Sequence, residues 1–396
     1  MKRKPFLKGI ILGSIVTVII MVTGNFAISV LGLGLGKDIA VSEKIATIAA
    51  ILNKKYVDDI DFEKLEEGIY DGMVNALGDP YTDYMTAEEF SNFLQDTEGE
   101  FYGIGVEVTT DINDGSIKVI SPIKNSPAEK AGILPDDRII KVNGIDVSGE
   151  KLDEAIKIIK GKEGTSVNVS IYRKLTNEIK NFDILREKIN VVTIEDKILE
   201  DNIGYIQISS FKENTYEQFK KSYENLMNQN IKGLIIDVRN NPGGNLKIVE
   251  EITDMLIPEG TLVYTIDKEG NREDYISDEN HIKIPLCVLV NGNSASASEV
   301  LSGAVQDTKT GKLVGTQTFG KGLVQGLYPL QDGSGIKITI QKYYTPKGVC
   351  IQGEGITPDY IVELPDEFKY QLRIDEKDDV QLKKAIEVIN EQIREK

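Results

Sequence analysis

The second half of the chain alternates short apolar runs with segments whose apolar residues recur every three or four positions. The apolar runs have the length of buried strands, and the other segments have the period of amphipathic helices. We expect strands at residues 203–211, 233–238, 262–266 and 285–290, and helices at 215–229, 246–256 and 299–305. Because strands alternate with helices, the pattern predicts an α/β fold with a largely parallel sheet.

Helical periodicity without strands predicts two further regions, an N-terminal helical region at residues 37–98 and a C-terminal helical tail at 366–396. The N-terminal region carries two apolar stripes, and the charged tail carries apolar residues that are available for packing. The stripes are Ile45, Ile48, Ala49, Leu52 and Tyr56, then Leu65, Ile69 and Met73, and the tail residues are Leu372, Leu382, Ile386 and Ile389.

The first 36 residues differ in kind from the rest of the chain. Basic side chains at Lys2, Arg3, Lys4 and Lys8 precede the stretch 9–36, which contains no charged residue. A helix rises ~1.5 Å per residue, so this stretch is long enough to cross ~30 Å of hydrocarbon. The basic flank should stay cytoplasmic, which predicts a single transmembrane anchor with the remaining chain outside the cytoplasm. A cleaved signal peptide is the alternative.

Charge and residue counts exclude several classes of function. The net charge of −17 argues against a nucleic-acid partner. Two cysteines, Cys287 and Cys350, are too few for a disulfide framework, although one bond between them is possible. With one histidine, His281, and scattered carboxylates, the sequence contains no cluster of metal ligands. We expect no metal or other cofactor.

The most informative stretch is 291–325, which begins after the apolar run 285–290. Its first residues form a turn rich in serine and alanine that leads into the predicted helix 299–305. Such a turn places hydroxyl groups at a helix N-terminus, where free N–H groups and the helix dipole favour a developing negative oxygen. Ser294, Ser296 and Ser298 are therefore candidate nucleophiles, or they simply cap the helix.

A serine nucleophile needs a base, and nothing near His281 indicates that its ring is held in place. Lysine is the known alternative base. Lys321 lies between Gly320 and Gly322, where close backbone approach is sterically possible. If residues 321–325 form a strand, Lys321 and Gln325 lie on one face, and Gln325 could orient the lysine amine by a hydrogen bond.

These motifs resemble the carboxyl-terminal processing proteases, also called tail-specific proteases. The family has its serine in an N-x-x-S-A-S-A-S-E segment and its lysine and glutamine in F-G-K-G-x-x-Q. The resemblance assigns the serine to Ser296, the lysine to Lys321 and the glutamine to Gln325. The separations, 321 − 296 = 25 and 325 − 321 = 4, match the family's usual spacing, which Ser294 and Ser298 would miss.

The resemblance also implies the fold and the rest of the site. It implies a crotonase-like protease core at residues 185–365, with a PDZ domain inserted before it, and N-terminal helices that help to form a homodimer. It places an oxyanion-hole donor in the DVRNNPGG turn, at Gly243 first and Gly244 second, paired with the N–H of Ala297. We expect Asp237 and Arg239 to tie the sheet to this turn by hydrogen bonds.

Residues 99–184 resemble a PDZ domain. FYGIGVEV is similar to its carboxylate-binding loop, and residues 152–161 are similar to its groove helix. Convergent N–H groups in the loop can bind a terminal carboxylate, and the strand that follows offers an edge to a peptide. The loop residues that we expect to bind are Tyr102, Gly103, Ile104, Gly105 and Val106. One departure is Asp136, which stands where many PDZ domains have glycine.

Two alternatives compete with a protease. Residues 315–321 fit G-x-x-x-x-G-K, a phosphate-binding loop, but Gly322 stands where that loop needs Ser or Thr. The other alternative is a catalytically silent, membrane-tethered PDZ adaptor, which would have no use for the three catalytic residues at that spacing. The sequence therefore predicts a membrane-anchored serine endopeptidase, active outside the cytoplasm on proteins with free apolar C-terminal tails.

Overall fold

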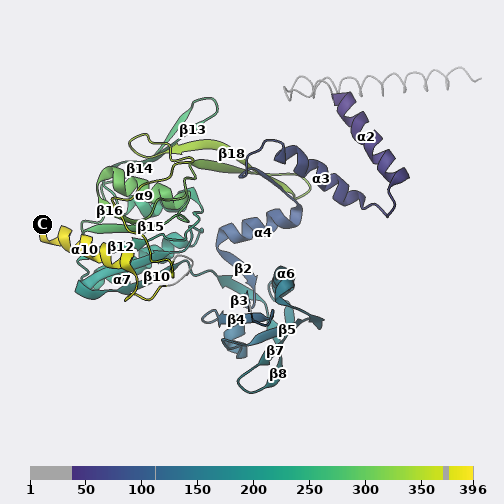
Figure 1. The fold of residues 1–396 in the computed structure, drawn as a ribbon, viewed down its shortest axis with the longest axis horizontal. Coiled ribbons are helices and arrows are strands. Elements are labelled where there is room, and N and C mark those ends of the chain that lie inside the picture. The colour runs from purple at the N-terminus through teal and green to yellow at the C-terminus, as the bar shows by residue number, and fades with distance from the viewer. Residues whose placement is uncertain (1–37, 112, 369–373, 396) are drawn as a thin grey trace, which may run out of the picture. The chain divides into compact units, whose positions relative to one another are not determined.

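The computed structural model describes residues 38–111, 113–368 and 374–395 (Figure 1). The chain divides into two compact units, residues 1–70 and 71–396. In the first unit, α2 (Asp38–Lys55) exposes apolar side chains of its predicted stripe, including Ile45 and Ile48. The next helix, α3 (Phe62–Asn75), continues into the second unit.

The predicted transmembrane segment at residues 9–36 lies outside the described residues. Among the helices that are described, none has both the length and the apolar character needed to cross a membrane.

The centre of the second unit is a six-stranded sheet with the order β10-β11-β12-β15-β16-β19. All neighbouring pairs are parallel except β10 with β11, which confirms the predicted largely parallel sheet. Every residue of β12 and β15 is buried, as expected for parallel strands that are covered on both faces. The bounds are β10 Ile194–Ile198, β11 Ile203–Ile208, β12 Gly233–Asp237, β15 Leu286–Val290, β16 Gly311–Gly315 and β19 Tyr360–Ile361.

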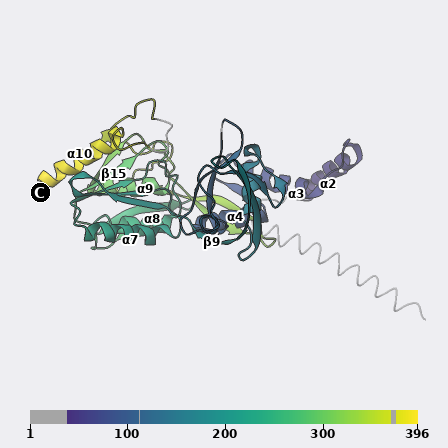
Figure 2. The same ribbon diagram turned by 90° about the horizontal axis from the view of Figure 1, so that it is seen from below.

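Helices cover both faces of this sheet (Figure 2). On one face, α7 (Thr215–Asn228), α8 (Leu246–Asp254) and α9 (Ala297–Thr308) contribute to the larger apolar core. On the other face, α10 (Val380–Glu395) packs Leu382 and Ile389 into a second core. The C-terminal tail therefore uses its apolar face inside its own chain.

A second, antiparallel sheet has the order β1-β18-β13-β14, with β17 also paired to β18. Strands β17 and β18 are antiparallel and form a hairpin at the DGSG turn. The sequence pattern missed β14, and it missed that β1 joins a strand more than 250 positions later. The bounds are β1 Asp83–Met85, β13 Gly260–Asp267, β14 Arg272–Ser277, β17 Leu323–Pro329 and β18 Gly335–Tyr344.

Between β1 and β10 in the chain, residues 106–185 form a separate antiparallel sheet with an apolar core of its own. Its strand order places β3 at one edge and β8 at the other, and α6 contributes Ala155 and Ile159 to its core. The flanking strands β2 (Glu100–Gly103) and β9 (Glu187–Asn190) pair with each other, so the chain enters and leaves at one place. The other elements are α4 Ala87–Glu98, β3 Val106–Thr110, β4 Ile117–Pro122, α5 Pro127–Ala131, β5 Arg138–Val142, β6 Ile145–Asp146, η1 Gly149–Lys151, α6 Leu152–Ile159, β7 Ser166–Arg173, β8 Glu178–Leu185 and η2 Glu200–Asn202.

The departure from the PDZ pattern at Asp136 has a structural explanation. Asp136 has φ of 68°, a left-handed conformation that glycine adopts freely and that Asp tolerates better than most residues. The next residue, Asp137, is buried and forms an ion pair of 2.7 Å with Arg173. The substitution therefore keeps the turn.

Candidate active site

One cavity of about 570 Å³ is lined by the residues that the sequence predicts to be catalytic. Ser296, Lys321 and Gln325 line it, together with Gly243 and Ala297 of the predicted oxyanion hole. The site lies where β12 and β15 of the parallel sheet end and turn into helices α8 and α9. Ligand sites of α/β sheets lie at these carboxyl ends because the turns expose helix N-termini there.

Ser296 occupies the last position before α9, with φ of 54° and ψ of −114°. This conformation is sparsely populated for a residue with a Cβ atom, and such strain accompanies nucleophiles on sharp strand-to-helix turns. Ser294 and Ser298 are both buried, and their hydroxyls donate to the carbonyl oxygens of Val238 at 2.8 Å and Asn241 at 2.9 Å. Ser296 is half-buried and is the serine of the three that lines the cavity.

Glu299, in the first turn of α9, connects the serine turn to the lysine loop. Its carboxylate is completely buried and accepts four hydrogen bonds. Oε2 accepts from the N–H groups of Ser296 at 2.9 Å and Lys321 at 2.8 Å. Oε1 accepts from the Thr318 hydroxyl at 2.6 Å and the Gly320 N–H at 2.8 Å. One side chain thus fixes the backbone at both predicted catalytic positions, a role that the sequence analysis missed.

Tyr343 of β18 makes a second connection between the same two positions. Its hydroxyl lies 3.0 Å from the carbonyl oxygen of Ser296 and also contacts the carbonyl oxygen of Lys321. Burial, helped by the Glu299 charge, raises the pKa of this phenol well above its usual value, so the hydroxyl keeps its proton.

Lys321 lies just before β17, so the expected strand over residues 321–325 is wrong in its first two residues. The reason is that Glu299 holds the Lys321 N–H outside any strand ladder. Opposite Val324 and Gln325, the partner strand β18 holds one extra residue, Ile340, between the residues that pair with them. Lys321 and Gln325 nevertheless line one cavity.

The surroundings of the Lys321 amine favour its neutral form over its protonated form. Burial lowers the pKa of Lys321 below its ordinary value, and the nearby Lys337 lowers it further, against the carboxylates of Asp79 and Glu299. The Nζ atom lies over the ring of Tyr81, 4.7 Å from its centroid. Within the described part of the chain, no hydrogen bond joins this Nζ to Ser296 or to Gln325.

Gln325 is half-buried, and its side chain has a different partner from the one expected. Its Nε2 donates to the Thr339 hydroxyl on β18, at 3.4 Å. In this conformation Gln325 therefore does not orient the lysine amine directly.

The predicted oxyanion-hole donors lie close to Ser296. Gly243 has φ of 105°, and a Cβ placed on it would lie 2.9 Å from the Ser296 Cβ and 3.0 Å from the Ala297 nitrogen. Only glycine fits such a close approach. Its N–H, however, donates to Asn241 Oδ1 at 2.9 Å. The Gly244 N–H, by contrast, has no hydrogen-bond partner among the described residues, so both glycines stay candidates.

Asn241 is a positioning residue that the sequence analysis missed. It is completely buried, and its Nδ2 donates to the Ile208 carbonyl at 2.8 Å while its Oδ1 accepts from Gly243. Its own carbonyl accepts from the Ala295 N–H at 3.0 Å. These bonds join the glycine-rich turn to the serine turn. The available signal was its place inside the NNPGG run, where a buried amide can satisfy several backbone groups at once.

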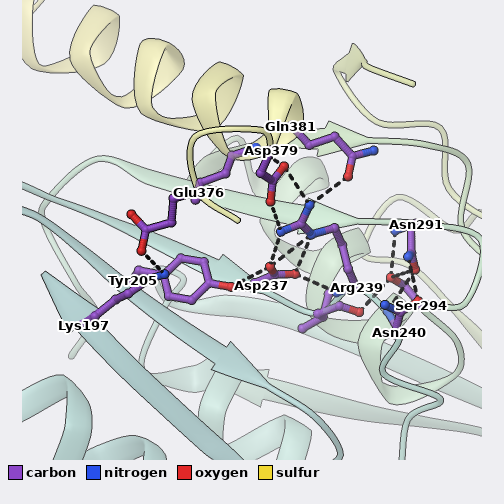
Figure 3. A network of polar contacts seen from close by, with 12 residues as sticks. Lys197, Tyr205, Asp237, Arg239, Asn240, Asn291, Ser294, Glu376, Asp379 and Gln381 are labelled. Atoms are coloured by element: carbon purple, nitrogen blue, oxygen red, sulfur yellow. Dashed lines mark hydrogen bonds and ion pairs between the residues drawn. The ribbon is translucent and has the colours of Figure 1, made fainter. Parts of the chain in front are cut away.

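Asp237 and Arg239 form a buried network on the side of the sheet that α10 covers (Figure 3). Arg239 makes ion pairs with Asp237 at 2.6 Å and with Asp379 at 2.8 Å, and Tyr205 donates to Asp237 at 2.7 Å. Burial alone would lower the pKa of Arg239, but the two carboxylates hold it above its usual value. These side chains thus tie the end of β12 to Asp379, the residue before α10, and among the described residues neither of them bonds to Gly243 or Gly244.

Replacing Asp379 by asparagine tests this network. Asparagine keeps the shape and can still cap α10, so the change removes mainly one charge beside a buried guanidinium. We expect the free energy of unfolding to fall by about 2–3 kcal/mol, measured by urea unfolding. The exposed Asp375→Asn is the control and should change little. Equal stability of D379N and the parent would show that Asp379 does not hold Arg239.

The residues predicted to bind a peptide carboxylate lie at the edge of the inserted domain. Tyr102 and Gly103 end β2, Ile104 is completely buried, and Val106 begins β3. Gly105 has φ of 73°, and a Cβ there would lie 2.4 Å from the Cβ of Ser126. The loop therefore needs glycine at this point, as a close backbone turn does.

Comparison with known proteins identifies the class and then the family. The profile of Peptidase family S41 matches residues 202–362, that of the PDZ domain matches 118–173, and that of the activating protease CtpB N-terminal domain matches 35–89. The chain is therefore a serine-type peptidase with a PDZ domain. The PDZ assignment indicates binding of peptide substrates.

Individual proteins that are similar in sequence to this chain also bear the names of proteases. The carboxy-terminal processing protease CtpB of Bacillus subtilis (strain 168) is 40% identical over 331 residues, which cover 82% of this chain and 68% of the relative. The "Probable CtpA-like serine protease" of Staphylococcus aureus (strain N315) is 38% identical, covering 94% of this chain and 74% of the relative. The chain belongs to the carboxy-terminal processing protease family, which confirms the resemblance seen in the sequence.

A solved structure supports the fold alone. A Bacteroides fragilis NCTC 9343 protein described as a candidate S41 protease superposes with a TM-score of 0.52 at 14% identity, covering 87% of this chain and 96% of that chain.

Proposed function

We propose that this chain is an endopeptidase that uses Ser296 as nucleophile, Lys321 as general base and Gln325 as a partner that orients the lysine. The observation that carries the proposal is the geometry of the serine turn. The hydroxyls of Ser294 and Ser298 donate hydrogen bonds to backbone carbonyls. Ser296, in contrast, lines the cavity that Lys321 and Gln325 also line.

The reaction follows from these positions. Ser296 Oγ attacks the peptide carbonyl while neutral Lys321 takes its proton and later returns it to the leaving amine. Since no hydrogen bond joins Lys321 to Ser296 in the described residues, Nζ must leave the Tyr81 ring and approach Oγ first. Gln325 would then turn from Thr339 toward the amine.

The oxyanion is stabilised by the N–H of Ala297 together with Gly243, or with Gly244 as the second choice. Gly243 must first release Asn241, which favours a rearrangement when substrate binds. Each such donor contributes about 3 kcal/mol of transition-state stabilisation.

The PDZ domain captures the substrate and the core cleaves it. A free, apolar C-terminal tail pairs with the edge strand β3, while the carboxylate meets the N–H groups of residues 102–106. The core in this proposal is crotonase-like. The PDZ domain spans residues 99–184 and the protease core spans residues 185–365.

The proposal extends to location and assembly. The uncharged stretch 9–36 with its basic flank supports a single-pass anchor in the cytoplasmic membrane and a catalytic part outside the cytoplasm. The exposed apolar residues of α2, among them Val41 and Ile51, support a homodimer formed through the N-terminal helices.

The test of this function compares two versions of one unfolded reporter protein. The first ends in a free apolar carboxyl terminus, and the second carries the same tail as an amide. We expect the full chain in detergent to cleave the first faster, by about tenfold, since the amide loses a charge-assisted contact. Binding of the free tail without cleavage of either reporter would instead identify a silent PDZ adaptor.

The lowered pKa of Lys321 gives a prediction on pH. The base acts only when neutral, so the acylation rate should rise about tenfold per pH unit below that pKa and level off above it. A plateau should be reached below the pH that an ordinary lysine would require. The rate of Ser296 acylation by an activated ester measures this. A flat profile between about pH 6 and pH 9 would count against a lysine base.

A further inference from the structure

Three lysines line the catalytic cavity, and they differ in how their charge is compensated. Lys212 Nζ forms an ion pair with Asp96 at 2.6 Å and also donates to the Asp96 carbonyl. Lys321 and Lys337, in contrast, form no ion pair with any of the described carboxylates. The cavity therefore contains two lysine amines, at Lys321 and Lys337, without an ion-pair partner among the described carboxylates.

Lys337 is held on β18, facing the site. It lies two positions before Thr339, which binds Gln325, and residues two apart share one face of a strand. Its Nζ lies 5.5 Å from the ring centroid of Phe93, another residue of the cavity wall. Asp83 is its cross-strand neighbour on β1 but makes no ion pair with it.

The carboxylates around Lys321 have other hydrogen-bond donors. Glu299 accepts four hydrogen bonds from the serine turn and the lysine loop. Asp79 accepts from the Tyr81 N–H at 3.1 Å and from the Thr82 hydroxyl at 2.6 Å. These bonds disperse the negative charge that would otherwise favour a protonated lysine.

The other groups that face Lys321 do not favour the neutral form of its amine, as Lys337 does. The ring of Tyr81 favours a cation, and the Tyr343 phenol is held neutral by burial. Like-charge repulsion from a second amine is a recognised way to keep a lysine neutral. Burial and Lys337 are thus the two influences that favour the neutral base.

We propose that Lys337 is a positioning residue that acts through Lys321, keeping its amine neutral by repulsion across the cavity. The inference rests on the proposed function, in which Lys321 is the base. Lys337 takes no part in bond making or breaking. The proton moves only between Ser296, Lys321 and the leaving amine.

The test is the pH profile of kcat/KM for a fluorogenic peptide, measured on the full chain in detergent. In Lys337→Gln and Lys337→Met the acid limb should move by about half to one unit toward higher pH, a three- to tenfold loss on the acid side. The rate on the alkaline plateau should not change. Lys337→Met keeps an unbranched side chain beside Phe93, and Lys337→Arg keeps the charge and should retain the parent profile.

Lys342→Gln is the matched control, because Lys342 lies on the same strand but is exposed. It should leave the profile unchanged. An unmoved acid limb in both neutral variants would overturn the inference, as would a loss that is equal at all pH values. A rise in KM of the neutral Lys337 variants that is equal at all pH values would also overturn the inference. It would indicate that Lys337 binds a carboxylate of the substrate. Activity retained in Ser296→Ala or Lys321→Ala would instead overturn the proposed function.

Discussion

Replacing Ser296 by alanine should lower kcat/KM by about 10⁴-fold or more, and Lys321→Ala should do the same. The Ser296 hydroxyl supplies the attacking oxygen, and the lysine amine removes its proton. Because the two groups act as one unit, the double variant should be no less active than either single variant. The measurement is hydrolysis of the free-tailed reporter by full-length chains.

The control is Ser302→Ala, six residues after Ser296 in α9. Ser302 is buried and its hydroxyl donates to the Ser298 carbonyl at 2.7 Å, away from the cavity. We expect its loss to cost at most about 1 kcal/mol of folding free energy and to leave the chemistry intact. If Ser296→Ala kept a tenth of the parent activity while folded, the nucleophile would have to be sought elsewhere.

Glu299→Gln should give the second large effect, on both stability and activity. The carboxylate accepts four hydrogen bonds through two oxygens, and the amide nitrogen of glutamine would face two of those donors. Each unsatisfied buried group costs about 1–3 kcal/mol. We expect the free energy of unfolding to fall by about 2–4 kcal/mol in urea.

The loss of activity should exceed what unfolding explains. Glu299 fixes the backbone of Ser296 and Lys321, and a misplacement of about 1 Å can cost about 100-fold in rate. We therefore expect kcat/KM to fall by about 100-fold or more after correction for the folded fraction. Glu354→Gln, at an exposed carboxylate, should leave both quantities unchanged. Full activity of folded E299Q would limit Glu299 to a role in stability.

Much of the fold could be predicted because its signals are local. The buried strands β12 and β15 appear in the sequence as continuous apolar runs. The PDZ domain was recognised from an ordered set of short motifs. In contrast, β1 is three residues long and pairs with β18, far away in the sequence, so no local period could reveal it.

The geometry of the candidate site was only partly predicted. The resemblance to the tail-specific proteases singled out Ser296, Lys321 and Gln325, and one cavity contains all three. The expected strand alternation from Lys321 was wrong, because a long-range bond from Glu299 fixes that backbone. The expected partner of Gln325 was not found either, since Thr339 accepts its hydrogen bond.

The sequence by itself determined the residue types of the site, the order of its motifs and the class of fold, since these depend on local period, turn chemistry and spacing. The tertiary structure decided which serine hydroxyl is available and which buried carboxylate joins two distant turns. It also decided that Lys321 shares its cavity with Lys337. Burial and hydrogen-bond satisfaction depend on residues far apart in the chain, so only the folded chain settles them.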